Sequence, residues 1–131
     1  MGKRHFTELG WRNDPWFRGL CNAIASCKTK EEIANFLRDL GSLSELQSWS
    51  ERLEVAKLLS QGFTYREVAK HTGASTTTVT RVARSVENGT GAYQKYLMGL
   101  RKEAALKKFE TPEEVQPAQP VKNGEALRKY L

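Results

Sequence analysis

The stretch that most restricts how this chain can fold is residues 65–84. Two short helices that cross at a steep angle need a small residue on the first helix, a glycine in the turn and branched apolar residues on the second. Those positions hold Ala69, Gly73, Val79 and Val82. The turn needs glycine because its left-handed backbone conformation is costly for other residues. Since one segment meets all of these independent requirements, it predicts a helix-turn-helix.

Both helices of this motif also begin with capping residues. Thr64 and Glu67 have the spacing of a capping box, in which each side chain accepts a hydrogen bond from the other residue's backbone amide. Ser75 stands where its hydroxyl caps the second helix. Two interpretations of Ser75 stay open: it serves as a cap alone, or it also contacts a ligand of the second helix.

Helix signals recur before the motif. Asp14 followed by Pro15 predicts a helix start, with aspartate as the N-cap and proline in the first turn. Thr29 and Glu32 form another capping box, which opens a second helix. Gly41 is expected to end that helix in a left-handed conformation.

A third helix is expected to start at Ser42 or Ser44 and to run to about Gln61. Its apolar residues cover more than one face, so it must be buried on more than one side, and a partner subunit is the expected second side. Residues 93–108 predict a last amphipathic helix. Because no strand pattern is present, the expected fold class is all-α with six helices.

Composition separates this helical region from the two ends of the chain. Residues 1–13 are basic and contain glycine, which predicts an irregular arm, whereas residues 109–131 hold three of the four prolines and predict a flexible tail. One helical domain is therefore expected over residues 14–108. No apolar run approaches the roughly 20 residues of a membrane span, and none follows the basic N-terminus as in a secretory signal, so we expect a cytoplasmic protein.

The second helix of the motif has a distinctive outward face. With its valines turned inward, the remaining side chains carry hydroxyl or guanidinium groups and none is acidic: Thr76, Thr77, Thr80, Arg81 and Arg84. The chain has a net charge of +6, which lies at this motif and at both ends. Such side chains suit a recognition helix in the major groove of double-stranded DNA. The predicted DNA-binding residues are these five with Thr64, Arg66 and Ser75.

Two alternatives accompany this interpretation. The threonines would form an ordinary solvated helix face, or the helix-turn-helix would be an interaction module that binds a protein partner instead of DNA. An enzyme is not expected, because the HExxH, GxSxG, P-loop and dinucleotide-binding motifs are absent. No metal site is expected either, since the two cysteines and two histidines lack the spacing of metal ligands.

Residues 16–100 resemble the YerC/YecD group of Trp-repressor-related proteins. The resemblance rests on the motifs RLEVAKLL at residues 52–59, TYREVA at 64–69, TGAS at 72–75 and GTGAY at 89–93. It implies a six-helix Trp-repressor-like fold, an intertwined homodimer and a DNA-reading head made by the helix-turn-helix. These implications agree with the dimeric transcriptional regulator that the residues themselves predict.

The resemblance also implies positions for a possible effector pocket. The two arginines that sandwich free tryptophan in the Trp repressor would fall on Arg52 and Arg81, and its carboxylate-side serine on Ser85. The repressor has glycine where this chain has Val82, whose branched side chain is expected to crowd the indole plane. We therefore expect no tryptophan corepressor and no other cofactor. The resemblance does not imply which small-molecule effector, if any, takes its place.

Overall fold

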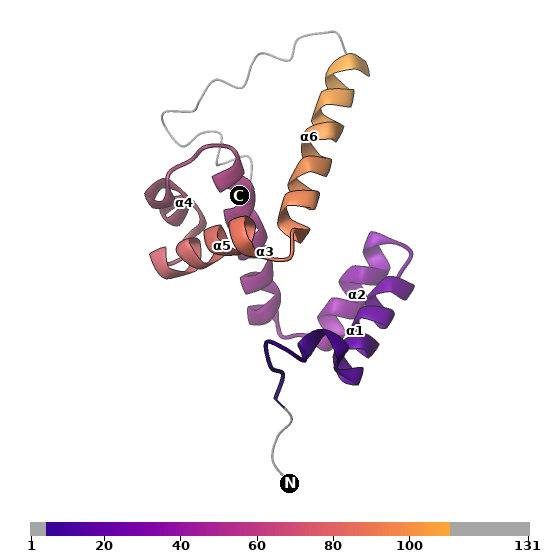
Figure 1. The fold of residues 1–131 in the computed structure, drawn as a ribbon. Helices are drawn as coiled ribbons and strands as arrows, with labels where there is room; N and C mark the ends of the chain where they lie inside the picture. Colours follow the sequence, from indigo (N-terminus) through magenta and orange to yellow (C-terminus); the bar gives the residue numbers. More distant parts are fainter. Residues whose placement is uncertain (1–4, 111–131) are drawn as a thin grey trace. The chain divides into compact units, whose positions relative to one another are not determined.

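The structure is a computed structural model that describes residues 5–110. Its described part contains six α-helices, one short 3-10 helix and no strand (Figure 1). In chain order these are η1 (Trp11–Asn13), α1 (Pro15–Ser26), α2 (Lys30–Leu40), α3 (Leu43–Ser60), α4 (Tyr65–Thr72), α5 (Thr76–Asn88) and α6 (Ala92–Glu110). The predicted all-α class and helix order are confirmed. The flexible tail was predicted over residues 109–131. Residues 109 and 110 belong to α6, and residues 111–131 lie outside the described residues.

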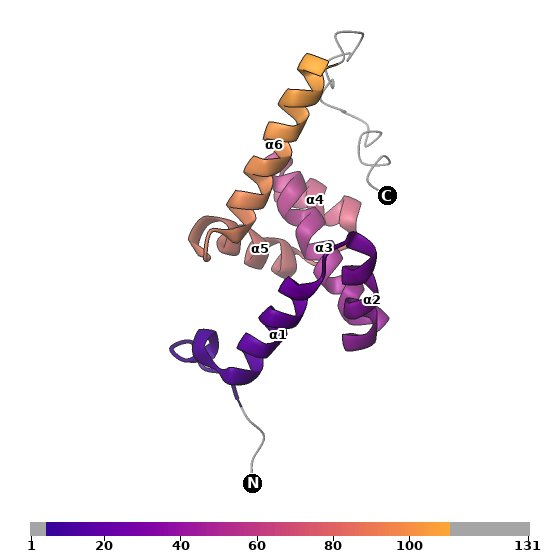
Figure 2. The same cartoon turned by 90° about the vertical axis from the view of Figure 1, so that its right-hand side faces the viewer.

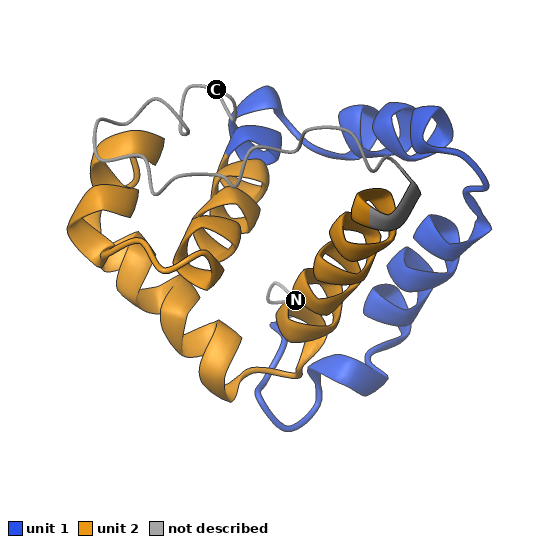
Figure 3. Cartoon of the chain, turned by 90° about the horizontal axis from the view of Figure 1, so that it is seen from above, with its two compact units in different colours: residues 1–47 blue, residues 48–131 orange. Residues whose placement is uncertain are grey.

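The chain divides into two compact units, residues 1–47 and 48–131, with the boundary inside α3 (Figure 3). Unit 1 holds η1, α1, α2 and the first turn of α3. Unit 2 holds the rest of α3 with the helix-turn-helix and α6, and a short turn joins α5 to α6 (Figure 2). None of the described helices has both the length and the apolar composition of a membrane span.

Within the described residues 5–13, unit 1 departs from the irregular arm that was predicted over residues 1–13. Residues 11–13 form η1, and Thr7 accepts hydrogen bonds from the backbone amides of Gly10 and Trp11. The ring of Phe17 on α1 packs edge-on against Trp11, with 5.2 Å between ring centroids, and against Phe6, at 6.1 Å. These aromatic contacts tie residues 6–11 to α1.

The N-caps of α1 and α2 are the residues that the sequence predicts, but one hydrogen bond of the second cap has a different donor. Asp14 accepts from the amide of Trp16 at 2.8 Å, as an N-cap should. Thr29 accepts from the amide of Glu32 at 3.1 Å, but the Glu32 carboxylate accepts from Lys28, one residue before the cap. The capping box predicted at Thr29 is therefore only half formed.

Ser42, not Ser44, opens α3. Its hydroxyl accepts from the amide of Glu45 at 3.1 Å, and the Glu45 carboxylate accepts from the amide of Ser42 at 3.0 Å. The hydrogen bond from the Ser42 amide, with a further one from the Ser42 side chain, favours the ionised carboxylate and lowers the pKa of Glu45. The predicted left-handed conformation of Gly41 is wrong: its φ of −115° and ψ of 158° are extended, because the chain passes directly from α2 into this cap.

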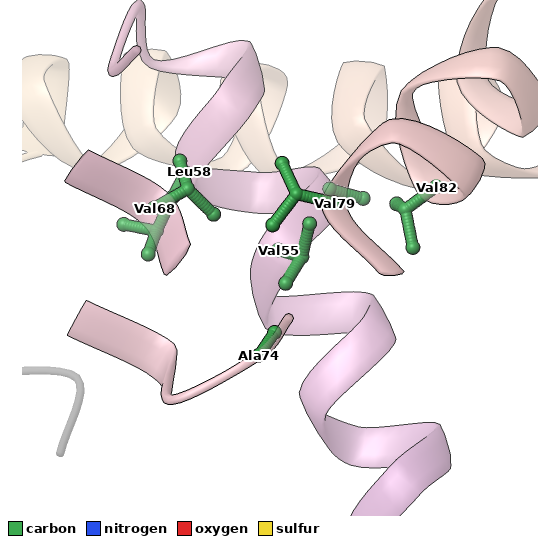
Figure 4. Close-up of a cluster of buried hydrophobic side chains, with 7 residues drawn as sticks. Val55, Leu58, Val68, Ala74, Val79 and Val82 are labelled. Carbon is green, nitrogen blue, oxygen red and sulfur yellow. The ribbon is translucent and has the colours of Figure 1, made fainter. Parts of the chain in front are cut away.

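Unit 2 contains the hydrophobic core that supports the helix-turn-helix (Figure 4). Its buried side chains come from α3, from α4 and the turn after it, and from α5: Val55, Ala56, Leu58, Val68, Ala74, Val79 and Val82. Ala69 packs half-buried against this cluster, as the small residue predicted for the helix crossing. The cluster fixes which face of α5 points outward.

Thr72 joins the two helices of the motif through its hydroxyl. It donates to the carbonyl of Val68 at 2.8 Å and accepts from the amide of Ala74 at 3.1 Å. Ala74 is buried, so removing the hydroxyl leaves its amide without a partner. We expect Thr72→Val to lower the free energy of unfolding by about 1–3 kcal/mol.

Urea titrations of Thr72→Val and of the wild type at equal protein concentration measure this loss. The matched control is Thr90→Val, because Thr90 is exposed in the connection before α6. Equal stability of all three proteins would show that the Thr72 hydroxyl does not hold the turn.

Candidate nucleic-acid interface

The helix-turn-helix is built by the local signals that the sequence carries. Thr64 accepts from the amide of Glu67 at 3.2 Å and Glu67 accepts from that of Thr64 at 3.4 Å, which confirms the capping box of α4. Gly73 has a φ of 76° and ψ of 0°, the predicted left-handed conformation. Ser75 caps α5 by accepting from the amide of Thr78 at 3.1 Å. The turn geometry predicted from the sequence is confirmed.

The outward face of α5 follows from the burial of Val79 and Val82, which are 0% and 3% exposed. Turned away from the core, α5 lines an open hollow of about 560 Å³. All five residues predicted for its outward face line this hollow, together with three further residues: Ser85, Asn88 and Gly89. The structure thus brings Thr76, Thr77, Thr80, Arg81 and Arg84 together on one surface, which we call the α5 face.

The hydroxyl groups of the α5 face differ in what they already bind. The hydroxyl of Thr80 donates to the carbonyl of Thr76 at 2.9 Å, and that of Ser85 donates to the carbonyl of Arg81 at 3.1 Å. The side-chain hydroxyls of Thr76 and Thr77 have no hydrogen-bond partner among the described residues, and both side chains are exposed. These two hydroxyls are therefore free to bind an external group.

The hydroxyl of Ser75 is used within the protein. Besides accepting from the amide of Thr78, it donates to the Thr78 hydroxyl at 3.0 Å. This arrangement favours the interpretation of Ser75 as a cap alone. The hydroxyl of Thr64 only accepts, from Glu67, and so keeps its proton for an external acceptor.

The charge of the α5 face is entirely positive. Arg81 and Arg84 are exposed, as is Arg66 on α4, and none of the three forms an ion pair within residues 5–110. The first turn of α5 has no acidic residue, so the partial positive charge at its N-terminus is not neutralised from its own sequence. A surface with free cations, free hydroxyls and a helix N-terminus favours a polyanion such as nucleic acid.

Only two of the three residues implied for an effector pocket lie together in this hollow. Arg81 and Ser85 line it, whereas Arg52 is exposed on α3 and is not among the lining residues. The side chain of Val82 belongs to the hydrophobic core and not to the hollow. In the described part of the chain, no three histidine, cysteine or acidic side chains lie close enough to hold a metal ion.

Sequence reasoning did not include Asn88 or Gly89 in the interface. Asn88 lies four residues after Arg84 on α5, so the helical repeat that grouped the other residues would also have found it. Gly89 ends α5 with its amide 2.9 Å from the carbonyl of Ser85. An added Cβ there would lie 2.3 Å from that carbonyl oxygen, so this close approach requires glycine.

Comparisons with known proteins agree with this fold. A family model described as Trp repressor protein matches residues 16–101. Protein YerC of Bacillus subtilis strain 168 is 45% identical over 75 residues, which cover 57% of this chain and 72% of the relative.

Two crystal structures are also similar to this chain. A TrpR-like protein from Eubacterium eligens ATCC 27750 has 38% identity and a TM-score of 0.64, covering 67% of this chain and 91% of that one. A candidate Trp repressor from Staphylococcus aureus has 35% identity and a TM-score of 0.67, covering 73% and 96%.

Proposed function

The chain belongs to the Trp repressor protein family, and from that premise we propose that it is a sequence-specific regulator of transcription that binds double-stranded DNA. In this proposal α5 enters the major groove and presents the α5 face to base edges and phosphates. The protein acts by binding and not by catalysis. A cytoplasmic location is part of the same proposal.

One observation carries this proposal: the α5 face collects free hydroxyl and guanidinium groups on a helix whose opposite side is buried. Hydroxyls and guanidinium groups bind phosphate oxygens, and arginine pairs with guanine through two parallel hydrogen bonds. Four of the first five residues of α5 are threonines, and three of them lie on the α5 face. A face that served only solubility would gain nothing from them, because threonine is a poor helix former. We assign Thr76 and Thr77 to base or sugar contacts, and Arg81 and Arg84 to guanine or phosphate.

We also propose that two copies form the active regulator. Helices α1 and α2 bury no residue within the chain. Large apolar side chains stay exposed on α1, α2 and α3, among them Trp16 at 67%, Leu40 at 53% and Leu43 at 64%. A second copy would cover this surface and give a two-fold pair of heads. Such a pair meets successive major grooves about 34 Å apart, so the operator should be a palindrome.

The proposal does not include tryptophan as a corepressor. Arg52, Arg81 and Ser85 stay candidate effector residues, with the Ser85 hydroxyl already donating to the carbonyl of Arg81. Isothermal titration of the protein with free tryptophan tests this part, and we expect no heat of binding.

Arg81→Ala tests the DNA-binding assignment. If Arg81 pairs with guanine, its loss weakens binding to the preferred sequence by about 1–3 kcal/mol and spares random duplex. If it binds only phosphate, all duplexes weaken alike, and the slope of log affinity against log salt falls by about one. Gel shifts over a salt series, on both a preferred and a random duplex, separate these outcomes.

The control for this experiment is Arg18→Ala, which removes the same charge from an exposed position on α1. Unchanged affinity of Arg81→Ala for every duplex would contradict the assignment. Binding to a protein partner, the alternative function, would then become the better explanation of the motif.

A further inference from the structure

The threonines of the α5 face offer different chemistry to a ligand. The Thr80 hydroxyl donates its proton to the carbonyl of Thr76 at 2.9 Å, one turn back on the same helix. A threonine hydroxyl has one proton, so Thr80 has none left for an external acceptor. Phosphate oxygens and the N7, O6 and O4 atoms of bases are all acceptors. Thr80 is therefore a poor hydrogen-bond partner for most of the groups that line the major groove.

The methyl group of Thr80 is what this residue can still offer. Thr80 lines the hollow of the α5 face and is half-buried. Its hydrogen bond to Thr76 holds the hydroxyl against the helix and restricts rotation about χ1. Thr77, by contrast, is exposed and its hydroxyl has no partner among the described residues. The α5 face thus combines free hydroxyls at its start with an oriented methyl group one turn later.

We propose that Thr80 is a specificity-determining residue that recognises the C5-methyl group of a thymine by apolar contact. This inference rests on the proposed function, since it names the base that one residue of the recognition helix selects. Thymine is the base that presents a methyl group in the major groove. The two-fold pair of heads would place one such thymine in each half-site.

Deoxyuridine substitution tests this contact, because it removes the methyl group of thymine and changes nothing else. A preferred duplex is first obtained by selection with the wild-type protein, and each thymine of a half-site is then replaced in both half-sites. We expect one position at which affinity falls about fourfold for each half-site, as for the loss of one buried methyl group.

Two variants assign that position to Thr80. Thr80→Val keeps a methyl group and removes the hydroxyl, so we expect wild-type affinity and unchanged sensitivity to deoxyuridine. Thr80→Ser keeps the hydroxyl and removes the methyl group, so we expect affinity to fall about fourfold for each half-site and the sensitivity to disappear. Thr90→Val and Thr90→Ser are the matched controls, and circular dichroism verifies that every variant is folded.

The opposite pattern overturns the inference: Thr80→Ser binds like the wild type and Thr80→Val binds weakly. A selected duplex in which no thymine responds to deoxyuridine overturns it as well, while the proposed function stands. Failure of the proposed function looks different, because the wild type would then select no sequence at all.

Discussion

Thr76→Glu is expected to remove DNA binding and to leave the fold intact. Thr76 is the first residue of α5 and is exposed on the α5 face. In the proposed complex a carboxylate there would lie against the negatively charged DNA, and like charges at an interface cost several kcal/mol. We expect affinity for a preferred duplex to fall by about 100-fold or more. The fold should not suffer, because an acidic residue in the first turn interacts favourably with the positive end of the helix dipole.

Fluorescence anisotropy with labelled duplex measures this loss, and a thermal melt of the free protein verifies the fold. Ser44→Glu is the matched control, because Ser44 is an exposed residue in the first turn of α3 and the change in net charge is the same. We expect Ser44→Glu to weaken binding by less than about threefold through net charge alone. Equal effects of the two variants would mean that the α5 face has no special part in binding.

Leu58→Ala is expected to be the most destabilising of the single substitutions considered. Leu58 on α3 is 1% exposed and is the largest fully buried side chain of the described core. It lies beside Val68 of α4, so its removal leaves a cavity under the helix-turn-helix (Figure 4). A leucine-to-alanine change in a core costs about 2–5 kcal/mol, through lost burial and the cavity that remains.

Chemical denaturation at equal protein concentration measures this cost. Leu9→Ala is the control, since Leu9 is 99% exposed and we expect a change below about 0.5 kcal/mol. Because α4 and α5 are held by this core, duplex affinity should fall along with stability. A Leu58→Ala protein as stable as Leu9→Ala would contradict the assignment of Leu58 to the core.

The helix-turn-helix was predictable because its signals are local. Gly73, the capping box at Thr64 and the cap at Ser75 each act within a few residues, so the order of side chains along the chain is enough to find them. The structure of residues 5–13 was mispredicted for the opposite reason. Its order depends on ring contacts of Phe6 and Trp11 with Phe17, and no periodic pattern reports contacts between aromatic rings that depend on how the chain turns.

The composition of the α5 face was predictable from helical periodicity, but its hydrogen bonds were not. Whether a hydroxyl binds its own helix depends on the side-chain rotamer, which the sequence does not specify. This is why Thr80 was grouped with Thr77 before the structure showed its hydrogen bond to the carbonyl of Thr76. The extended conformation of Gly41 was also not predicted, because it depends on where the next helix, α3, begins.

Selection from a pool of random duplexes is the measurement that tests the central claim most directly. The claim is that α5 presents its threonines and arginines to the major groove of DNA. We predict enrichment of a palindrome whose half-sites lie about one helical turn apart, and loss of that enrichment in Thr76→Glu. A wild-type protein that enriches no sequence, and has no duplex affinity at about 50 mM salt, would contradict it.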